Sequence, residues 1–571
     1  MAFMATPTST IPTPTPSTPA AAPAGSAPLA AFGGVRRVPQ PINESNKSYA
    51  PGSPERAELK ERLRAMAAER LDIPLVIGGR ELRTGRTAQS VMPHNHKQVL
   101  ADYHLAGPQE VQQAIAAAAE ARREWGSWPW EDRAAVLLRA AELLSTSWRA
   151  TLNAATMLGQ SKTAFQAEID AASEMIDFWR FNTHFAQELY HEQPISGPGV
   201  WNQMEYRPLE GFVYAVSPFN FTAIGGNLTT APALMGNTII WKPASSAILS
   251  GYYTLKLLEA AGLPPGVINF IPGDAREISN LLLDSPELAG VHFTGSTEVF
   301  NGMWKKIGEN IGRYRSYPRL VGETGGKDFI VVHPSADPVE VAVAIARGGF
   351  EYQGQKCSAA SRVYVPQSLW KEIRERTTAM MNEIKVGDVS DFRNFMGAVI
   401  DQKAFTKIGG YIDDAKRNAK ILAGGEASGD DGYFIHPTLI QTEDPGYRAL
   451  CEEIFGPVVT AYVYPDQEWQ QTLEIVDRTS PYALTGAVFS RDRVGVRQAM
   501  STLRNAAGNF YVNDKPTGAV VGQQPFGGAR GSGTNDKAGS KLNLVRWVSA
   551  RTIKETFSPP RDYKYPFMTE K

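Results

Sequence analysis

Residues 211–217 read GFVYAVS, a short apolar run of the β-branched and aromatic residues that favour a β-strand. Three similar runs follow: NTIIWKP (237–243), VINFIPG (267–273) and LAGVHFTGS (288–296). Stretches with helical periodicity, such as 247–262 and 276–284, lie between these runs. Strands that alternate with helices in this way predict an α/β fold whose parallel sheet is covered by helices on both faces.

Several polar and small residues of this region fall where the predicted strands end. They are Asn220, Lys242, Gly273, Gly295 and Ser296. Because ligands of open parallel sheets bind beyond the carboxyl ends of the strands, we expect a ligand site here. The dinucleotide fingerprint GxGxxG is absent. The Gly-Ser turn of FTGSTEVF (293–300) nevertheless opens a helix that can present backbone N–H groups to a phosphate.

The pattern continues on both sides of this region. Amphipathic helices are predicted at 109–126, 131–148 and 164–189. A second α/β block runs from about 329 to 515, and the glycines of GETGGKD (322–328) mark its boundary with the first block.

Composition excludes several classes of partner. The chain has 571 residues, 43% of them hydrophobic and 20% charged, with a net charge of -1, so we expect neither nucleic acid nor an anionic membrane as partner. The stretch 211–241 carries no charge, but its prolines, asparagines and paired glycines argue against a transmembrane helix. The expected partners are small molecules and further copies of this chain.

The chain has only two cysteines, Cys357 and Cys451. Two cannot form a disulfide framework, and neither CxxC nor HExxH is present, which indicates a reducing compartment and no structural metal. Cys357 lies in FEYQGQKCSAASR (350–362), beside a glycine turn and among polar neighbours rather than in an apolar core segment. This placement indicates a reactive thiol.

The first 35 residues carry no charged side chain and are rich in Ala, Pro, Thr and Ser. This composition predicts a disordered or cleaved segment. Two interpretations stay open, a processed transit peptide and a plain flexible tail.

Six motifs occur together in one order: SPFNF (217–221), WKPAS (241–245), FTGSTEV (293–299), GETGGKD (322–328), GQKCSAASR (354–362) and EEIFGPV (452–458). In order and spacing they resemble the aldehyde dehydrogenase superfamily, over nearly the whole stretch from 60 to 558. Further stretches, above all VVGQQPFGGARGSGTND (520–536), resemble its glutamate γ-semialdehyde dehydrogenases. The resemblance implies NAD-dependent oxidation of that aldehyde to glutamate in proline catabolism.

The resemblance also implies the catalytic residues. Cys357 matches the family nucleophile, whose thiolate attacks the aldehyde carbon to create the tetrahedral centre that can release a hydride. The Asn220 amide and the Cys357 backbone N–H match the oxyanion donors. Glu323, in GETGG, matches the general base that activates water against the thioester.

For the cofactor, the resemblance implies NAD and a set of contact residues. These are Ser217, Phe219, Lys242, Ser245, Gly273, Gly295, Ser296, Glu453 and Phe455. Ser245 stands where many relatives have an acid that repels the 2′-phosphate of NADP, so exclusion of NADP is expected to be incomplete. Phe300 stands where many relatives have the last glycine of the phosphate turn.

For the substrate, the resemblance implies a glycine-rich anchor loop, here KPTGAVVGQQPF (515–526), that binds the α-carboxylate. Gly518 fits this role, whereas Ala519 stands where a serine is common, with a loss of one hydroxyl contact worth roughly 1 kcal/mol. Ser358 and Phe526 resemble other pocket members. Glu168, in the QAEID stretch, is our candidate partner for the α-ammonium group.

The implied architecture is aldehyde dehydrogenase-like, with a Rossmann-type NAD-binding domain, an α/β catalytic domain and a small bridging element. We divide the chain into a disordered leader or tail (1–50), the NAD-binding domain (51–186 and 210–323), the catalytic domain (324–530) and the bridging element (187–209 and 531–571). In that element we expect an extension at 187–209 to pair with LVRWVSA (544–550). An open edge strand there predicts a homodimer or an assembly of dimers.

The remaining expectations concern the cellular setting and the alternatives. We expect the mitochondrial matrix, or the cytoplasm for a bacterial chain, and a transient contact with a proline-oxidising enzyme. Two other functions stay open: a dehydrogenase for another ω-semialdehyde acid, and a non-catalytic protein that retains the fold.

Overall fold

The computed structural model describes residues 33–568 and contains the four strands predicted between 211 and 296. They form a seven-stranded sheet in the order β11-β10-β7-β8-β9-β2-β3. The bounds are β11 (Arg319–Glu323), β10 (Leu288–Thr294), β7 (Phe212–Val216), β8 (Thr238–Lys242), β9 (Ile268–Phe270), β2 (Leu75–Ile77) and β3 (Arg80–Leu82). The five strands from β11 to β9 are parallel.

The edge formed by β2 and β3 differs from the wholly parallel sheet that we expected. These two strands pair antiparallel with each other, and β2 pairs antiparallel with β9 through Val76 and Phe270. Gly78 and Gly79 join them in the left-handed backbone region. This is the two-residue hairpin connection that glycine permits and other residues resist.

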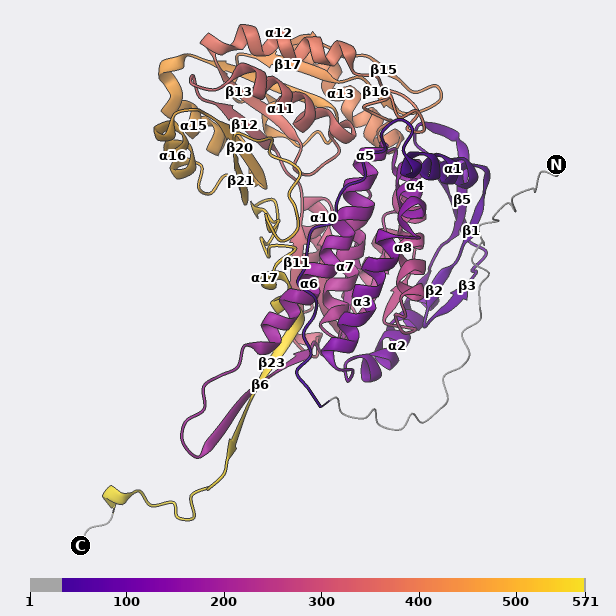
Figure 1. Ribbon diagram of the computed structural model, residues 1–571, viewed down its shortest axis with the longest axis vertical. Coiled ribbons are helices and arrows are strands. Elements are labelled where there is room, and N and C mark those ends of the chain that lie inside the picture. Colours follow the sequence, from indigo (N-terminus) through magenta and orange to yellow (C-terminus); the bar gives the residue numbers. More distant parts are fainter. Residues whose placement is uncertain (1–32, 569–571) are drawn as a thin grey trace, which may run out of the picture. The chain divides into compact units, whose positions relative to one another are not determined.

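Helices cover both faces of this sheet, as predicted (Figure 1). Alternate residues of β7 face opposite layers, since Phe212 and Tyr214 pack in one hydrophobic cluster and Val213 and Ala215 in another. The first layer contains α2 (Pro108–Trp125), α9 (Ala275–Leu283) and α10 (Thr297–Glu309). The opposite layer contains α3 (Trp130–Ser145), α4 (Arg149–Gln160), α7 (Thr222–Leu234) and α8 (Ile248–Ala260).

The predicted helix at 164–189 is present but is not uniform. It consists of α5 (Ala164–Ala167), a π-helical turn η1 (Glu168–Glu174) and α6 (Met175–His191). A π-turn bonds residue i to i+5, so it rotates the side chains that follow it relative to a regular α-helix. The same layer also receives α1 (Pro54–Ala68), which packs on α4.

A second seven-stranded sheet carries the rest of the chain, in the order β14-β17-β18-β13-β12-β20-β21. The bounds are β14 (Lys420–Ala423), β17 (Thr438–Thr442), β18 (Val458–Tyr464), β13 (Ala360–Pro366), β12 (Asp328–Val332), β20 (Thr485–Phe489) and β21 (Asn509–Val512). Only the β14–β17 pair is antiparallel. Its helices include α11 (Pro338–Phe350), α12 (Gln367–Glu383), α13 (Gln402–Asn418), α15 (Trp469–Arg478) and α16 (Arg493–Thr502).

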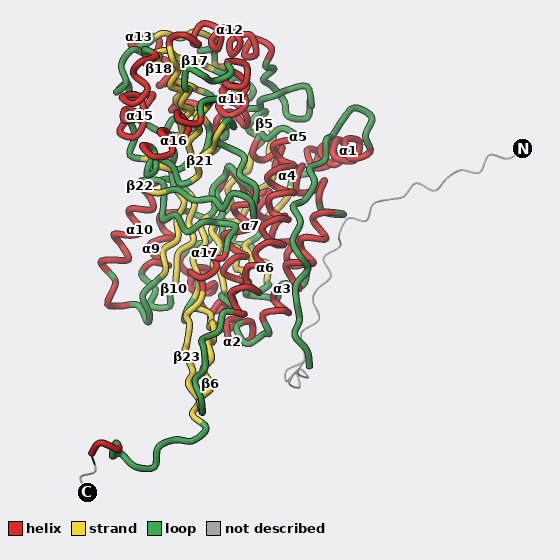
Figure 2. The backbone as a smooth tube through the Cα atoms, turned by 60° about the vertical axis from the view of Figure 1, so that its left-hand side comes forward, coloured by secondary structure: helices red, strands yellow, loops and turns green. Residues whose placement is uncertain are grey.

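A two-stranded antiparallel ribbon forms the predicted extension, between β6 (Val200–Pro208) and β23 (Val548–Thr556). Figure 2 shows it projecting away from the helices and leading into the C-terminal segment. Its bounds differ from the prediction, because α6 continues to His191 and 545–547 form a 3-10 turn. A ribbon of two strands is only marginally stable on its own.

Smaller elements complete the fold. They are the three-stranded sheet of β1 (Leu71–Ile73), β5 (Asn95–His104) and β4 (Thr87–Met92), the pairs β15 (Ala427–Ser428) with β16 (Phe434–Ile435) and β19 (Tyr482–Ala483) with β22 (Ala529–Arg530), and the short helices α14 (Arg448–Cys451) and α17 (Lys541–Leu544). Residues from Val38 onward form one compact unit, so the domain boundaries proposed above stay predictions.

The expectation of disorder across 1–50 is wrong for its second part. Residues 1–32 lie outside the described residues, but 38–50 run without helix or strand against the rest of the chain, with Tyr49 buried. Hydrogen bonds from this segment to the helices, described below, hold it in place. Within the described range no helix is both long and apolar enough to cross a membrane.

Candidate active site

Cys357 follows a strained turn that side chains from other elements hold in place. Tyr352, Gln353 and Gly354 adopt three consecutive left-handed conformations, with φ of 51°, 57° and 64°. A non-glycine residue in this region costs about 1–3 kcal/mol, so the surroundings must impose it. The Gln353 amide does so, donating to the carbonyls of Ser161 (3.0 Å) and Ala398 (2.7 Å) and accepting from Gly397 N–H (3.0 Å).

The Cys357 thiol is partly exposed. Burial of the sulfur raises its pKa well above the usual value, and the carboxylates of Asp328, Glu323, Glu453 and Glu174 raise it further. The free thiol is therefore held in its protonated form, and a nearby base must take its proton before it can attack.

Glu323 ends β11 beside this thiol. Burial raises the pKa of its carboxyl well above the usual value, while a hydrogen bond from Gly528 N–H (3.1 Å) and the charge of Lys537 act in the opposite direction. Its backbone carbonyl accepts a hydrogen bond from Gly295 N–H at 3.2 Å. A carboxylate whose pKa is raised is a stronger base than one with the usual pKa, which suits Glu323 to take a proton from water.

Asn220 lies between β7 and α7 and joins the same site. Its side chain is 3% exposed, and its amide donates to the Gln355 carbonyl at 3.1 Å, two residues before Cys357. One amide proton remains for a ligand, because an asparagine amide carries two.

A buried ion pair fastens the two loops of the site to each other. Lys162 donates to Asp170 at 2.7 Å, and its ammonium lies 3.9 Å from the Phe221 ring centroid and 4.5 Å from that of Tyr352. Asp170 in turn accepts from the N–H groups of Thr222 (2.9 Å) and Ala223 at the start of α7. The pair therefore links the turn before Cys357 to the segment after Asn220.

The carboxyl ends of β7 and β8 bring Ser217 and Lys242 together. Ser217 accepts from the Trp241 indole N–H at 2.9 Å. Lys242 is buried, and within the part of the chain that the structure describes its ammonium makes no hydrogen bond or ion pair. Burial lowers the pKa of Lys242 to about 8, against the weaker opposing effect of Asp274. A buried ammonium without a protein partner is suited to donate hydrogen bonds to a ligand or to water.

Gly295 and Ser296 open α10 in a turn suited to phosphate. Ser296 caps the helix by accepting from Val299 N–H at 3.3 Å, and a Cβ at Gly295 would lie 2.7 Å from the Phe293 ring. Phe293 stacks on Phe300, with ring centroids 5.3 Å apart. Phe300 thus stands where many relatives have a glycine, and its ring packs on the strand residue Phe293. The N-terminus of α10 is suited to bind an anion.

The other five predicted cofactor residues lie at several separate positions. Gly273, with φ of 158°, pairs through an isolated bridge with Ala106, and Ser245 is exposed at the start of a 3-10 turn. The Glu453 carboxylate accepts from Gly326 N–H at 2.8 Å. Phe455, which is also left-handed (φ 61°), meets the ring of Phe219 edge-on at 5.8 Å. The Phe219–Phe455 contact joins loops of the two large sheets.

The anchor loop lies beside the nucleophile. Ser358 donates to the hydroxyl of Thr517 at 2.8 Å, which places Gly518 and Ala519 near Cys357. Gly518 has φ of 94°, in the left-handed region that glycine adopts without the clash that a Cβ would cause. Phe526, half-buried, closes the loop through a bridge with Ala538.

Glu168 is not part of this constellation, so its prediction as a substrate contact is not supported. The carboxylate is fully buried and accepts from Lys47 N–H (2.6 Å), Tyr49 O–H (2.7 Å), Asn153 (2.8 Å) and Arg149. With these donors it has no capacity left for a substrate ammonium group.

Another carboxylate close enough to act on the Cys357 thiol is Glu174, which we did not predict. It is partly exposed, its charge raises the pKa of Cys357, and it accepts no side-chain hydrogen bond within the described residues. Burial, followed by Asp170, raises the pKa of Glu174 to about 8. The π-turn η1 runs from Glu168 to Glu174, and a turn of this kind rotates the side chains that follow it relative to a regular α-helix.

Comparison with known proteins identifies the family. The aldehyde dehydrogenase family model matches residues 81–553. The chain belongs to the aldehyde dehydrogenase family. It is 52% identical over 538 residues to the mitochondrial delta-1-pyrroline-5-carboxylate dehydrogenase of Dictyostelium discoideum, covering 93% of this chain and 96% of that protein.

Solved structures of the family agree. The NAD-bound delta-pyrroline-5-carboxylate dehydrogenase of Mycobacterium tuberculosis is 53% identical with a TM-score of 0.91, covering 94% of this chain and all of that one. Proline utilization A of Bdellovibrio bacteriovorus is 30% identical with a TM-score of 0.86, and the match covers 91% of this chain and 54% of that one. The predicted fold class is thereby confirmed. Within the described residues no cluster of His, Cys, Asp and Glu could hold a metal ion.

Proposed function

We propose that this chain catalyses the NAD-dependent oxidation of L-glutamate γ-semialdehyde, the open form of 1-pyrroline-5-carboxylate, to L-glutamate in proline catabolism. The observation that carries the proposal is the convergence of Cys357, Asn220 and Glu323 beside the anchor loop at Gly518. The names of the relatives at about half identity agree with it.

The chemistry begins at the sulfur. The Cys357 thiol loses its proton to a base and attacks the aldehyde carbon, forming a C–S bond and an oxyanion. The second amide proton of Asn220 and the Cys357 backbone N–H stabilise that oxyanion, each donor being worth about 3 kcal/mol in the transition state. Bound NAD would supply the acceptor for the hydride, the hydrogen that leaves this carbon with its electron pair.

The resulting thioester is then hydrolysed. Glu323 removes a proton from water, the water oxygen attacks the thioester carbon, and the C–S bond breaks to release glutamate and the Cys357 thiolate. Gly528 N–H and Lys537 stabilise the ionised base. Because burial raises the pKa of Glu323, the hydrolytic step slows as the pH falls through that raised value.

The site's unpaired groups fit NAD. Lys242 offers an ammonium to ribose hydroxyls, and the α10 N-terminus at Gly295 and Ser296 offers backbone N–H groups to the pyrophosphate. The neighbours Ser217, Phe219, Ser245, Gly273, Glu453 and Phe455 complete the proposed cofactor contacts. Ser245, an exposed hydroxyl without charge, does not repel a 2′-phosphate, so discrimination against NADP is incomplete.

Replacing Lys242 by methionine should weaken NAD binding while stabilising the free protein. Loss of a charged hydrogen bond lowers affinity by about tenfold to a hundredfold. The pKa of Lys242 is lowered to about 8 in the fold, below the unfolded value, so protonated Lys242 destabilises the fold below that pH and methionine removes this penalty.

Titration calorimetry with NAD and thermal unfolding without it measure both effects. Lys371→Met, on an exposed lysine of α12, is the matched control and should change neither quantity. Unchanged NAD affinity in Lys242→Met would contradict the assignment.

We assign the substrate's charged ends to two elements. The α-carboxylate binds backbone N–H groups at Gly518 and Ala519, with Ser358 and Phe526 lining the pocket, and the α-ammonium faces Glu174. An ammonium partner also lowers the raised pKa of Glu174 and restores its ionised form at neutral pH.

NADH formation across a panel of aldehydes tests the proposed function and this assignment together. Glutamate semialdehyde should be the best substrate, ahead of 5-oxopentanoate, which lacks the amino group, and of propanal. Glu174→Gln should lower kcat/KM about tenfold for the semialdehyde and leave 5-oxopentanoate unaffected. Glu188→Gln, exposed on α6, is the control. Equal turnover of semialdehyde and propanal by the unaltered chain would overturn the proposed substrate.

Assembly and location complete the proposal. We propose a homodimer or an assembly of dimers in which the ribbon β6–β23 is covered, because its row of strand edges and exposed Trp201 favour a partner chain. The mitochondrial name of the Dictyostelium relative supports the mitochondrial matrix as the location, and for a bacterial chain the location would be the cytoplasm. The likeness to proline utilization A supports a transient contact with a proline-oxidising enzyme.

A further inference from the structure

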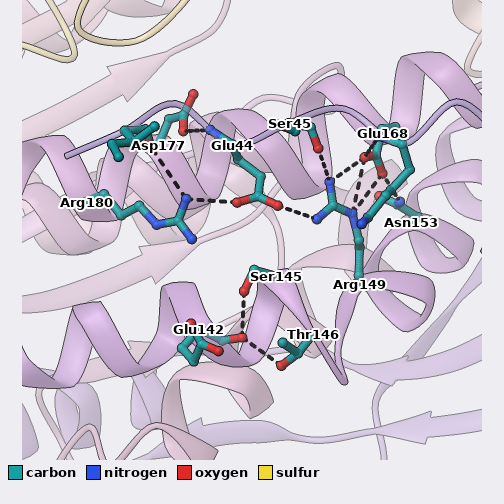
Figure 3. A network of polar contacts seen from close by, with 12 residues as sticks. Glu44, Ser45, Glu142, Ser145, Thr146, Arg149, Asn153, Glu168, Asp177 and Arg180 are labelled. Carbon is teal, nitrogen blue, oxygen red and sulfur yellow. Dashed lines mark hydrogen bonds and ion pairs between the residues drawn. The ribbon is translucent and has the colours of Figure 1, made fainter.

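The segment 38–50, here named the N-terminal strap, lies along the helices that carry Arg149, Glu168 and Arg180 (Figure 3). It has no internal helix or strand, so contacts with other elements alone fix its course. Val38 N–H donates to Gln187 of α6 at 2.8 Å, and Arg149 of α4 donates to the Ser45 carbonyl at 3.0 Å. These contacts extend from one end of α6 to the start of α4.

An ion network holds the middle of the strap. The Glu44 carboxylate bonds Arg149 at 2.7 Å through one oxygen and Arg180 at 2.8 Å through the other. Although burial alone would raise it, the pKa of Glu44 is lowered by these two guanidinium groups. Arg149 also bonds Glu168, the first residue of η1, and the side chains of Arg149 and Glu168 are 7% and 0% exposed. Buried ion pairs of this kind fix the local geometry, because breaking one pair leaves a buried charge without a partner.

The strap is hydrogen-bonded to the helical segment that carries Glu174, both before and after that residue. On one side, Glu168 accepts from Lys47 N–H and Tyr49 O–H. On the other, Asp177 accepts from Glu44 N–H at 2.7 Å. The orientation of the π-turn, and with it the direction of the Glu174 carboxylate, therefore depends on the strap.

Asn43 connects the strap to the anchor loop through hydrogen bonds. Its amide N–H groups donate to Asp177 at 2.7 Å and to the Val521 carbonyl at 2.8 Å, and its amide oxygen accepts from Gln523 at 2.9 Å. Burial raises the pKa of Asp177 to about 6, so it is an ionised acceptor at neutral pH and fixes which way the Asn43 amide points.

The 520–524 turn of the anchor loop depends on this contact, because the hydrogen bonds that the turn makes by itself are local. Residues 520–524 close a tight turn, with Gln523 and Gln524 N–H donating to the Val520 carbonyl at 3.0 and 2.9 Å. Gly522 lies directly against α6, since a Cβ there would meet the Phe181 ring at 2.2 Å. Val521 is two residues after Ala519, so a shift of this turn moves the backbone N–H groups proposed for the carboxylate.

We propose that the N-terminal strap, through Asn43, positions the anchor loop and the Glu174 helix for the amino-acid end of the substrate and so determines substrate specificity. This inference rests on the function proposed above. Asn43 touches neither the aldehyde carbon nor the nucleophile loop, and it is a positioning residue. Its loss should therefore affect substrates that bear the α-carboxylate and α-ammonium, and not aldehydes that lack them.

The test compares kcat and KM of Asn43→Ala for glutamate semialdehyde, for propanal and for NAD. KM for the semialdehyde should rise about tenfold, corresponding to the loss of the bridging hydrogen bonds. The kcat/KM for propanal and the KM for NAD should stay within about twofold. Asn46→Ala, an exposed strap residue without a side-chain hydrogen bond in the described part of the chain, is the matched control.

Two outcomes overturn the proposal: an equal loss for semialdehyde and propanal, which indicates a general structural role, or no change for either. If Asn43→Ala fails to fold, Gln523→Ala decides, since it removes one bond to Asn43 from an exposed position and should raise the semialdehyde KM about threefold, again without change for propanal. Failure of the proposed function is distinguishable, because the unaltered chain would then show no preference for the semialdehyde over propanal.

Discussion

Cys357→Ala should abolish NADH formation from glutamate semialdehyde, lowering kcat by at least about a thousandfold. The sulfur forms the bond that converts a planar carbonyl into the tetrahedral centre from which hydrogen can leave, and no neighbouring group replaces it. Alanine fits the position, because Cys357 lies in a turn whose shape depends on Gln353 and Gly354 rather than on the thiol. NAD affinity by calorimetry and the unfolding temperature should remain near those of the unaltered chain.

Cys451→Ala is the matched control. This second cysteine is the last residue of α14 and is also partly exposed. Its thiol lies 3.4 Å from the Gly446 carbonyl. The variant should keep activity within about twofold. Full activity in Cys357→Ala, or loss of activity in both variants, would contradict the nucleophile assignment, and absence of activity in the unaltered chain would favour a non-catalytic protein.

Glu323→Gln should separate the two halves of the reaction. Glutamine keeps the shape of the side chain and its acceptor for Gly528 N–H, but it cannot remove a proton from water. The first turnover should still release about one NADH per site, and the steady-state rate should fall about a hundredfold to ten-thousandfold. Rapid-mixing absorbance of NADH measures both phases.

The pH profile supplies an independent check on the same variant. Burial raises the pKa of Glu323, so the steady-state rate of the unaltered chain should decline on the acid side of that raised value. The decline should be absent in Glu323→Gln. Loss of the first turnover together with the steady state would instead assign Glu323 to activation of the thiol rather than of water.

The sheet and its ligand edge could be predicted because their signals are local. Short apolar runs spaced by helical periods specify β7, β8, β9 and β10 independently of the rest of the chain. The hairpin of β2 and β3 escaped prediction, since two three-residue strands carry too little pattern and their place in the sheet depends on one long-range pair with β9.

The residues of the candidate site also fall into those that the sequence could predict and those that it could not. Cys357, Asn220 and Glu323 lie in motifs that could be read directly, and the structure brings their loops together. Glu174 could not be chosen over Glu168, because the π-turn that separates their directions has no signature in helical periodicity. The strap could not be found either. Its composition is polar, and its order comes from partners as distant in sequence as Val521.

The most direct test of covalent catalysis by Cys357 is peptide mass spectrometry of Glu323→Gln after mixing with glutamate semialdehyde and NAD and quenching in acid. We expect one glutamyl group bound as a thioester to the peptide that contains Cys357, and no such group when NAD is omitted. A glutamyl adduct on Cys451, or no adduct although NADH has formed, would contradict it.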